Sequence, residues 1–271
     1  MMSDVHLGCI EGSPAEVDLI TSVCQSVGSL SADIPDTLGA RDWLRINNQR
    51  DKNACCGNAA DKALEFNRWL SLGRQTRPED LSARFSYVAA LQWANTLHRG
   101  DQGVSIEAGV MASRDIGAVL EEAWPYWQDG ERFDTELPRH LVERAGQHRV
   151  RSVSRVTTGR EVIEALGNGV GACVFGMYWT AGMSAYRGGV LAGVPGGPRL
   201  GGHAVCACDY DLRRNTIWVT NSHGEQWGDR GWFEVTVPVF DQLLQQPFGA
   251  FIVSDLQGFP PRKWNWRGFM V

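Results

Sequence analysis

The segment INNQRDKNACCGNAA, residues 46–60, holds a glutamine, Gln49, and two adjacent cysteines, Cys55 and Cys56, just before a helix-like run. Apolar side chains then recur at helical spacing and predict a helix over residues 58–71: Ala59, Ala63, Phe66 and Leu70. The N-terminal end of a helix carries partial positive charge, which favours a thiolate over a thiol. The segment therefore predicts a reactive cysteine at the start of a helix.

A second segment, GGHAVCACDYD at residues 201–211, supplies a histidine, His203, at the head of a strand-like run. Asn221 follows a further strand-like run, in VTNSHGEQWGDRGWF. A thiol nucleophile needs an imidazole to exchange a proton with, a group that orients the imidazole, and donors for the developing oxyanion. The chain carries cysteine, His203 and Asn221 in that order, and Gln49 is a candidate oxyanion donor.

Outside these segments, the first half of the chain has helix-like sequence patterns and the second half has strand-like ones. Helices are expected near 81–99 and 105–118, and a short one at 159–167. The second half is rich in strand-like runs separated by turns, the last of them FGAFIVSDL at 248–256. We expect an α+β fold, with a helical lobe followed by a β-rich lobe and a cleft between them.

The expected organisation has four parts. Residues 1–34 are an N-terminal extension, residues 35–145 the helical lobe with the nucleophile, residues 146–255 the β-rich lobe with the histidine and asparagine, and residues 256–271 a tail. SPAE, at residues 13–16, is a helix start with a capping serine and a proline in the first turn. We expect a helix within 13–30 that packs on the body of the protein and does not gate the cleft.

Composition and charge exclude several classes of protein. The net charge of -5 gives no overall basic face for nucleic acid or anionic lipid. No apolar run is long enough to cross a bilayer, and the N-terminus lacks the pattern of a secretory signal. A cytoplasmic or host-cytoplasmic location is expected, with secretion by another route as the alternative. The seven cysteines include no CxxC pair, so we expect neither a metal site nor a cofactor.

Taken together, the segments resemble papain-like (C1) cysteine peptidases, with bacterial and viral members the most similar. The resemblance rests on NNQRDKNACCGNAA, LSARFSYVAAL, DQGVSIEAGVMA and GGHAV…DYD…IWVTNSHGEQWGDRGWFEV, and it extends over roughly residues 35–255. It implies the papain-like fold, with a β-barrel-like second lobe, and hydrolysis of protein or peptide substrates without a cofactor. Separate segments in the right order make it more specific than any single motif.

The resemblance also implies a role for each candidate residue. Counted from Gln49, the nucleophile of the family falls on the sixth residue, Cys55. His203 would form the ion pair and act as general acid, Asn221 would orient the imidazole, and Gln49 would donate to the oxyanion. A shift of one residue would instead make Cys56 the nucleophile.

The chain departs from the family pattern near the site. His223 replaces a tryptophan that, in the family, covers the bond between the asparagine and the histidine. The smaller histidine would weaken that cover or add a second pH-sensitive group, unless it is an exposed loop residue. Arg50, Asn53 and Asp209 stand where glycine is usual. Two other functions therefore remain open: acyl transfer or cleavage of isopeptide or cell-wall amides by the same residues, and a catalytically silent binding domain.

Overall fold

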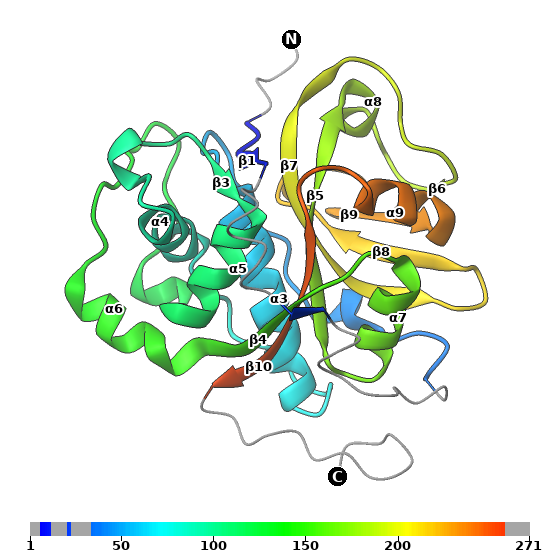
Figure 1. Ribbon diagram of the computed structural model, residues 1–271, viewed down its shortest axis with the longest axis horizontal. Helices are drawn as coiled ribbons and strands as arrows, with labels where there is room; N and C mark the ends of the chain where they lie inside the picture. The colour runs from blue at the N-terminus through cyan, green and yellow to red at the C-terminus, as the bar shows by residue number, and fades with distance from the viewer. Residues whose placement is uncertain (1–5, 12–20, 23–33, 258–271) are drawn as a thin grey trace.

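Helix α3, Cys55–Ser71, runs through the middle of the computed structural model, between a group of helices and a large sheet (Figure 1). The structure describes residues 6–11, 21–22 and 34–257. The helix expected over 58–71 begins three residues earlier, at Cys55. It does so because the Ala54 carbonyl accepts bonds from both the backbone and the side-chain nitrogen of Asn58, at 3.0 and 2.8 Å.

Three helices lie on one side of α3; the first two are shorter than the helices expected at 81–99 and 105–118, and the third was not expected from the sequence. They are α4 (Ala83–Trp93), α5 (Ile106–Asp115) and α6 (Arg139–Ala145). Ser82 and Ser105 cap the first two through their side chains. The helix expected to reach residue 99 ends at Trp93, because Asn95 adopts a left-handed conformation with φ of 55°.

The sheet on the other side has eight strands among the described residues. In their order across the sheet they are β2 (Thr21–Ser22), β4 (Arg149–Arg155), β10 (Ala250–Gln257), β5 (Gly171–Thr180), β7 (Arg199–Asp211), β8 (Thr216–Thr220), β9 (Trp232–Thr236) and β6 (Val190–Leu191). Neighbours are antiparallel, except for the outermost pair at each edge. Three short helices accompany the sheet: α7 (Gly159–Gly167), α8 (Ala181–Ser184) and α9 (Val237–Leu244).

The α+β class expected from the sequence is confirmed, and α3 joins its two halves. Helix α3 packs against α4 and α5 on one side and against β5, β7 and β10 on the other. Nearly every side chain along α3 is buried, including the aromatic rings of Phe66 and Trp69. Burial on all sides explains why this helix carries so few exposed polar residues.

Two strands lie apart from the large sheet, at the junction of the two halves. Strand β1 (Cys9–Ile10) pairs in parallel with β3 (Val104–Ser105), and in Figure 1 β1 lies between the helices and β7. The segment near the N-terminus is thus built into the junction.

The helix expected within residues 13–30 is not continuous. Thr21–Ser22 form β2, which pairs in parallel with β4, and the rest of that range lies outside the described residues. Most of the tail, residues 258–271, also lies outside them.

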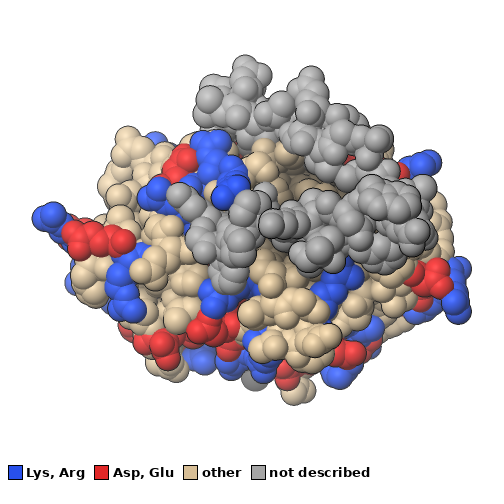
Figure 2. All heavy atoms as spheres, turned by 90° about the horizontal axis from the view of Figure 1, so that it is seen from below, with Lys and Arg blue, Asp and Glu red and all other residues tan. Residues whose placement is uncertain are grey.

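Charged side chains of both signs are interspersed on the face seen from below (Figure 2). Two of the surface ion pairs link residues one helical turn apart, Arg139 with Glu143 and Arg160 with Glu164. No helix among the described residues is both long and apolar enough to cross a membrane.

Candidate active site

Cys55 is the first residue of α3, and its side chain is completely buried. Burial raises the pKa of the Cys55 thiol well above its usual range, and the neighbouring Cys56 raises it further, while the interaction with His203 lowers it. Burial and Cys56 therefore favour the neutral thiol, whereas the nearby His203 imidazole favours the thiolate.

Cys56 points to different neighbours. Its sulfur donates a hydrogen bond to the Val104 carbonyl at 2.9 Å, and it lies beside Cys9. Burial raises the pKa of Cys56 well above its usual range, and its main neighbours in this shift are Cys55, Cys9 and Glu107. The two adjacent thiols thus face different surroundings, and Cys55 is the one that interacts with His203.

His203 lies on β7 and is fully buried, and one of its two ring nitrogens is hydrogen-bonded. Its Nε2 lies 2.7 Å from Oδ1 of Asn221. The backbone nitrogen of Ser222 donates to the same oxygen at 2.8 Å, which identifies that atom as the acceptor and leaves Nε2 as the donor. Nδ1 of His203, which then lacks a proton in the neutral ring, makes no nitrogen or oxygen hydrogen bond among the described residues.

Pairing of β7 with β8 brings the histidine and the asparagine together. Cys206 of β7 is opposite Thr220, the last residue of β8, and Asn221 follows directly. The backbone nitrogen of Asn221 donates to the Gly231 carbonyl at 2.9 Å, which anchors the turn after the strand. Two side chains far apart in sequence are therefore fixed by strand register.

Gln49 connects the two halves of the structure. Its Nε2 donates to the carbonyls of Lys52 and His6, both at 2.9 Å, and its Oε1 accepts from the Ser222 hydroxyl at 2.6 Å. Its backbone nitrogen donates to the Ser222 carbonyl at 2.7 Å. Every polar atom of this buried amide is bonded, so its orientation is set.

Aromatic rings enclose the imidazole. The ring centroid of Trp179 lies 4.5 Å from that of His203, and His223 lies 4.9 Å from His203 with its ring tilted by 33°. The His223 ring also meets Trp179 edge-on at 5.1 Å, and burial lowers the pKa of His223 to about 4. His223 is therefore a neutral packing partner of His203 near neutrality, and not an exposed loop residue.

Sequence patterns did not reveal two other contacts. Trp179 lies in one of the strand-like runs and packs against His203, and Tyr126 donates its hydroxyl to the Gln49 carbonyl at 3.0 Å. The chain segment His6–Glu11 was also missed: it covers the site, as the His6–Gln49 bond shows. A β-strand of two residues has too little pattern to be recognised in sequence.

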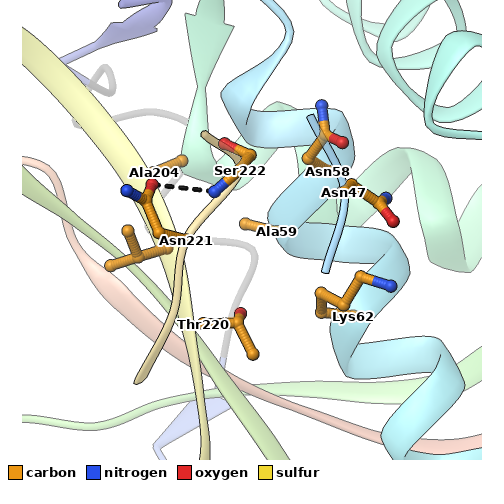
Figure 3. Close-up of a pocket in the computed structure, with 9 residues that line it drawn as sticks. Asn47, Asn58, Ala59, Lys62, Ala204, Thr220, Asn221 and Ser222 are labelled. Carbon is orange, nitrogen blue, oxygen red and sulfur yellow. Dashed lines mark hydrogen bonds between the residues drawn. The ribbon is translucent and has the colours of Figure 1, made fainter. Parts of the chain in front are cut away.

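A small cavity lies next to Asn221, between α3 and the sheet half of the structure (Figure 3). Asn58, Ala59 and Lys62 of α3 line it on one side, and Thr220, the last residue of β8, lines it with Asn221 and Ser222 on the other. No cluster of potential metal ligands occurs among the residues that the structure describes.

Comparisons with known proteins agree on one family. A family model described as papain family cysteine protease matches residues 46–241. A curated relative, the uncharacterized peptidase C1-like protein L477 of Acanthamoeba polyphaga mimivirus, is 27% identical in an alignment 215 residues long that covers 72% of this chain. The aligned part is 65% of that relative, so this chain spans about two thirds of its length.

Solved structures share the fold at low sequence identity. Xylellain, a cysteine protease from Xylella fastidiosa, has a TM-score of 0.74 and 19% identity over 94% of this chain and 98% of its own. A cysteine protease from Carica candamarcensis in complex with E-64 has a TM-score of 0.60 and 18% identity over 83% of this chain and 100% of its own. The papain-like fold expected from the sequence is thereby confirmed.

Proposed function

The chain belongs to the papain family of cysteine proteases, and we propose on that premise that it hydrolyses peptide bonds with Cys55 as the nucleophile. The observation that carries this proposal is the arrangement of His203: one ring nitrogen bonds Asn221, and the other is left to exchange a proton with the Cys55 thiol. We assign the nucleophile to the helical lobe, residues 35–145, and the histidine and asparagine to the β-rich lobe, residues 146–255.

The first chemical step would form a thioester. The Cys55 sulfur, having passed its proton to Nδ1 of His203, attacks the carbonyl carbon of the substrate. Negative charge develops on the carbonyl oxygen, and the Gln49 side chain and the Cys55 backbone N–H would donate to it. When the C–N bond breaks, His203 returns the proton to the leaving amine.

The second step would release the acid product. A water molecule attacks the thioester carbonyl while His203 takes one of its protons, and the C–S bond then breaks. The proton returns to the sulfur, which restores the thiol. Asn221 acts throughout by holding the ring so that Nδ1 faces the sulfur.

The experiment that tests this proposal is labelling by an epoxide inhibitor of cysteine peptidases, with the modified residue located by mass spectrometry. We expect Cys55→Ala to lose both labelling and peptide hydrolysis, and Cys56→Ala to keep both. Labelling that persists in Cys55→Ala and disappears in Cys56→Ala would move the nucleophile by one residue. A wild-type chain that is labelled but hydrolyses no peptide would contradict the peptidase assignment.

A further inference from the structure

The hydroxyl of Tyr126 lies between the two segments that carry the proposed oxyanion donors. It donates to the Gln49 carbonyl at 3.0 Å, and it shares a side-chain hydrogen bond with Asn58, one turn along α3 from Cys55. The Asn58 amide in turn donates to the Ala54 carbonyl at 2.8 Å, directly before Cys55. A single hydroxyl therefore links the backbone at Gln49 to the start of α3.

The backbone of Gln49 is held from both halves of the structure. Its nitrogen donates to the Ser222 carbonyl at 2.7 Å, from the sheet half, and its carbonyl accepts from Tyr126, from the helical half. That carbonyl also accepts from the Lys52 nitrogen at 3.1 Å, but this bond lies within the same loop and moves with it. Tyr126 therefore anchors Gln49 to the half in which Cys55 lies.

The loop that follows Gln49 is held in a strained conformation by the stretch of chain that follows Tyr126. Arg50 has a φ of 51°, a left-handed conformation that non-glycine residues keep only when their surroundings hold them. Its guanidinium donates to the Gln128 side chain at 3.1 Å, and Asp51 accepts from the Gly130 nitrogen at 3.3 Å. Water competes with both of these exposed bonds, whereas the Tyr126 bond is partly buried. Tyr126 therefore opposes relaxation of this loop more effectively than either.

Tyr126 is itself firmly placed. Its backbone nitrogen donates to the Glu121 carboxylate at 2.8 Å, and the Trp124 carbonyl accepts at 2.6 Å from the hydroxyl of Ser82, the residue that caps α4. Its ring packs edge-on against Trp127, with the ring centroids 5.2 Å apart. Burial raises the pKa of Tyr126, so its hydroxyl keeps its proton near neutrality and remains a donor.

We propose that Tyr126 is a positioning residue for the oxyanion site. Its hydroxyl fixes the Gln49 side chain relative to the Cys55 backbone N–H, so that both can donate to one oxygen atom. The catalytic consequence rests on the proposed function, because it requires an oxyanion to form there. The placing of Gln49 by Tyr126 does not, and it can be measured without a substrate.

The first test measures the environment of the Gln49 amide in full-length variants. Its side-chain NH₂ gives a nitrogen–hydrogen NMR signal, assigned by its absence in Gln49→Ala. We expect Tyr126→Phe, which keeps the ring and removes only the hydroxyl, to shift this signal and to speed exchange of its protons with water. Tyr210→Phe is the matched control: it removes a comparable bond, from its hydroxyl to the Pro35 carbonyl at 2.8 Å, and should leave the signal unchanged.

The second test measures peptide hydrolysis. Tyr126→Phe should lower kcat about 3- to 30-fold with little change in KM, since one neutral hydrogen bond is lost and its effect appears in the transition state. In a Gln49→Ala background the same substitution should change kcat less than about 2-fold, because the group that Tyr126 positions is already gone. Alkylation of Cys55 by iodoacetamide forms no oxyanion, so its rate and pH profile should match the wild type in Tyr126→Phe.

An unchanged Gln49 signal in Tyr126→Phe would overturn the proposal whatever the activity. In an active wild type, an unchanged kcat in Tyr126→Phe would also overturn it, and so would an equal loss of kcat in both backgrounds, which indicates a general structural effect. A Gln49 signal that moves in Tyr126→Phe, when the wild type hydrolyses no peptide, would support the positioning by Tyr126 while contradicting the proposed function.

Discussion

Gln49 illustrates how a single side chain serves both structure and proposed chemistry. Its amide oxygen accepts from the Ser222 hydroxyl, and its amide nitrogen donates to the carbonyls of His6 and Lys52. An amide fixed in this way can donate to a developing oxyanion without reorganising. Its orientation depends on residues from both halves of the molecule.

We predict that Gln49→Ala lowers kcat by about 10²- to 10³-fold with a much smaller change in KM, since the lost donor acts mainly in the transition state. Steady-state hydrolysis of a peptide substrate measures both constants. Asn48→Ala, which alters the exposed preceding residue, is the matched control and should stay close to wild type. An unchanged kcat in Gln49→Ala would remove this residue from the oxyanion site.

His223 makes the stability of the fold depend on pH. Burial lowers its pKa from 6.5 to about 4, so the unfolded chain binds a proton at this residue before the folded protein does. Stability is therefore lost as the pH falls from about 6.5 toward 4. The protonatable group that it packs against is His203, from β7. His148, whose pKa burial also lowers, adds a contribution of the same sign.

We predict that His223→Phe keeps the packing but loses part of this pH dependence. Between pH 7 and pH 4.5 the free energy of unfolding should fall by about 1–2 kcal/mol less in the variant than in the wild type, as one pKa unit corresponds to about 1.4 kcal/mol. Urea unfolding at both pH values provides the measurement. Identical differences in the two proteins would show that the His223 ring is not shielded from protons.

At the scale of elements, α3 carries an acid inside the protein. Asp61 is fully buried, and its pKa is raised well above its usual range, chiefly by burial. The Ser86 hydroxyl donates to one carboxyl oxygen, and Lys62 on the same helix instead bonds Glu65. The folded state therefore favours neutral Asp61, and stability declines as the pH rises above about 4, where the unfolded chain releases this proton.

We predict that Asp61→Asn removes this decline, because the amide has a similar shape and does not ionise. At pH 8 the variant should be more stable than the wild type by about 1–3 kcal/mol, and near pH 4 the two should be equal within error. Denaturant unfolding between pH 4 and pH 8 measures the sign of this difference in stability. Asp42→Asn, at an exposed aspartate, is the control and should alter neither end of the curve. A wild type that gains stability toward pH 8 relative to Asp61→Asn would contradict the account.

At the scale of the whole molecule, the two halves share one helix and one junction. Helix α3 contacts elements of both, and the segment at Gln49 pairs with the segment at Ser222 through backbone bonds of 2.7 and 3.0 Å. Neither half can unfold without exposing the apolar surface of α3. The structure thus favours a single cooperative unfolding transition for the whole chain over separate unfolding of the two halves.

We predict that α4 and β8, which belong to opposite halves, lose protection from hydrogen exchange at the same urea concentration. Exchange followed by mass spectrometry through the unfolding transition resolves peptides from each element. A lower midpoint for either element would show that its half opens independently.

Local patterns predicted some elements well and others poorly. Helix α7 has the expected bounds, residues 159–167, because Thr158 and Glu161 form a capping box and the apolar face is regular. The N-terminal helix was expected across residues that include β2, whose pairing with distant β4 has no local signal. The end of α4 was placed too late because the left-handed turn at Asn95 outweighed a continuing apolar pattern.

For the site, sequence by itself determined the kinds of residue, their order and the α+β class, since a helix start, strand alternation and motif spacing are local properties of the chain. Only the tertiary structure decided how these parts meet. Strand register brings His203 within hydrogen-bond distance of Asn221, and the different directions of the two thiols give Cys55 and Cys56 different neighbours. The cover formed by His6–Glu11 depends on a fit between surfaces distant in sequence, and such a fit exists only once the chain has folded.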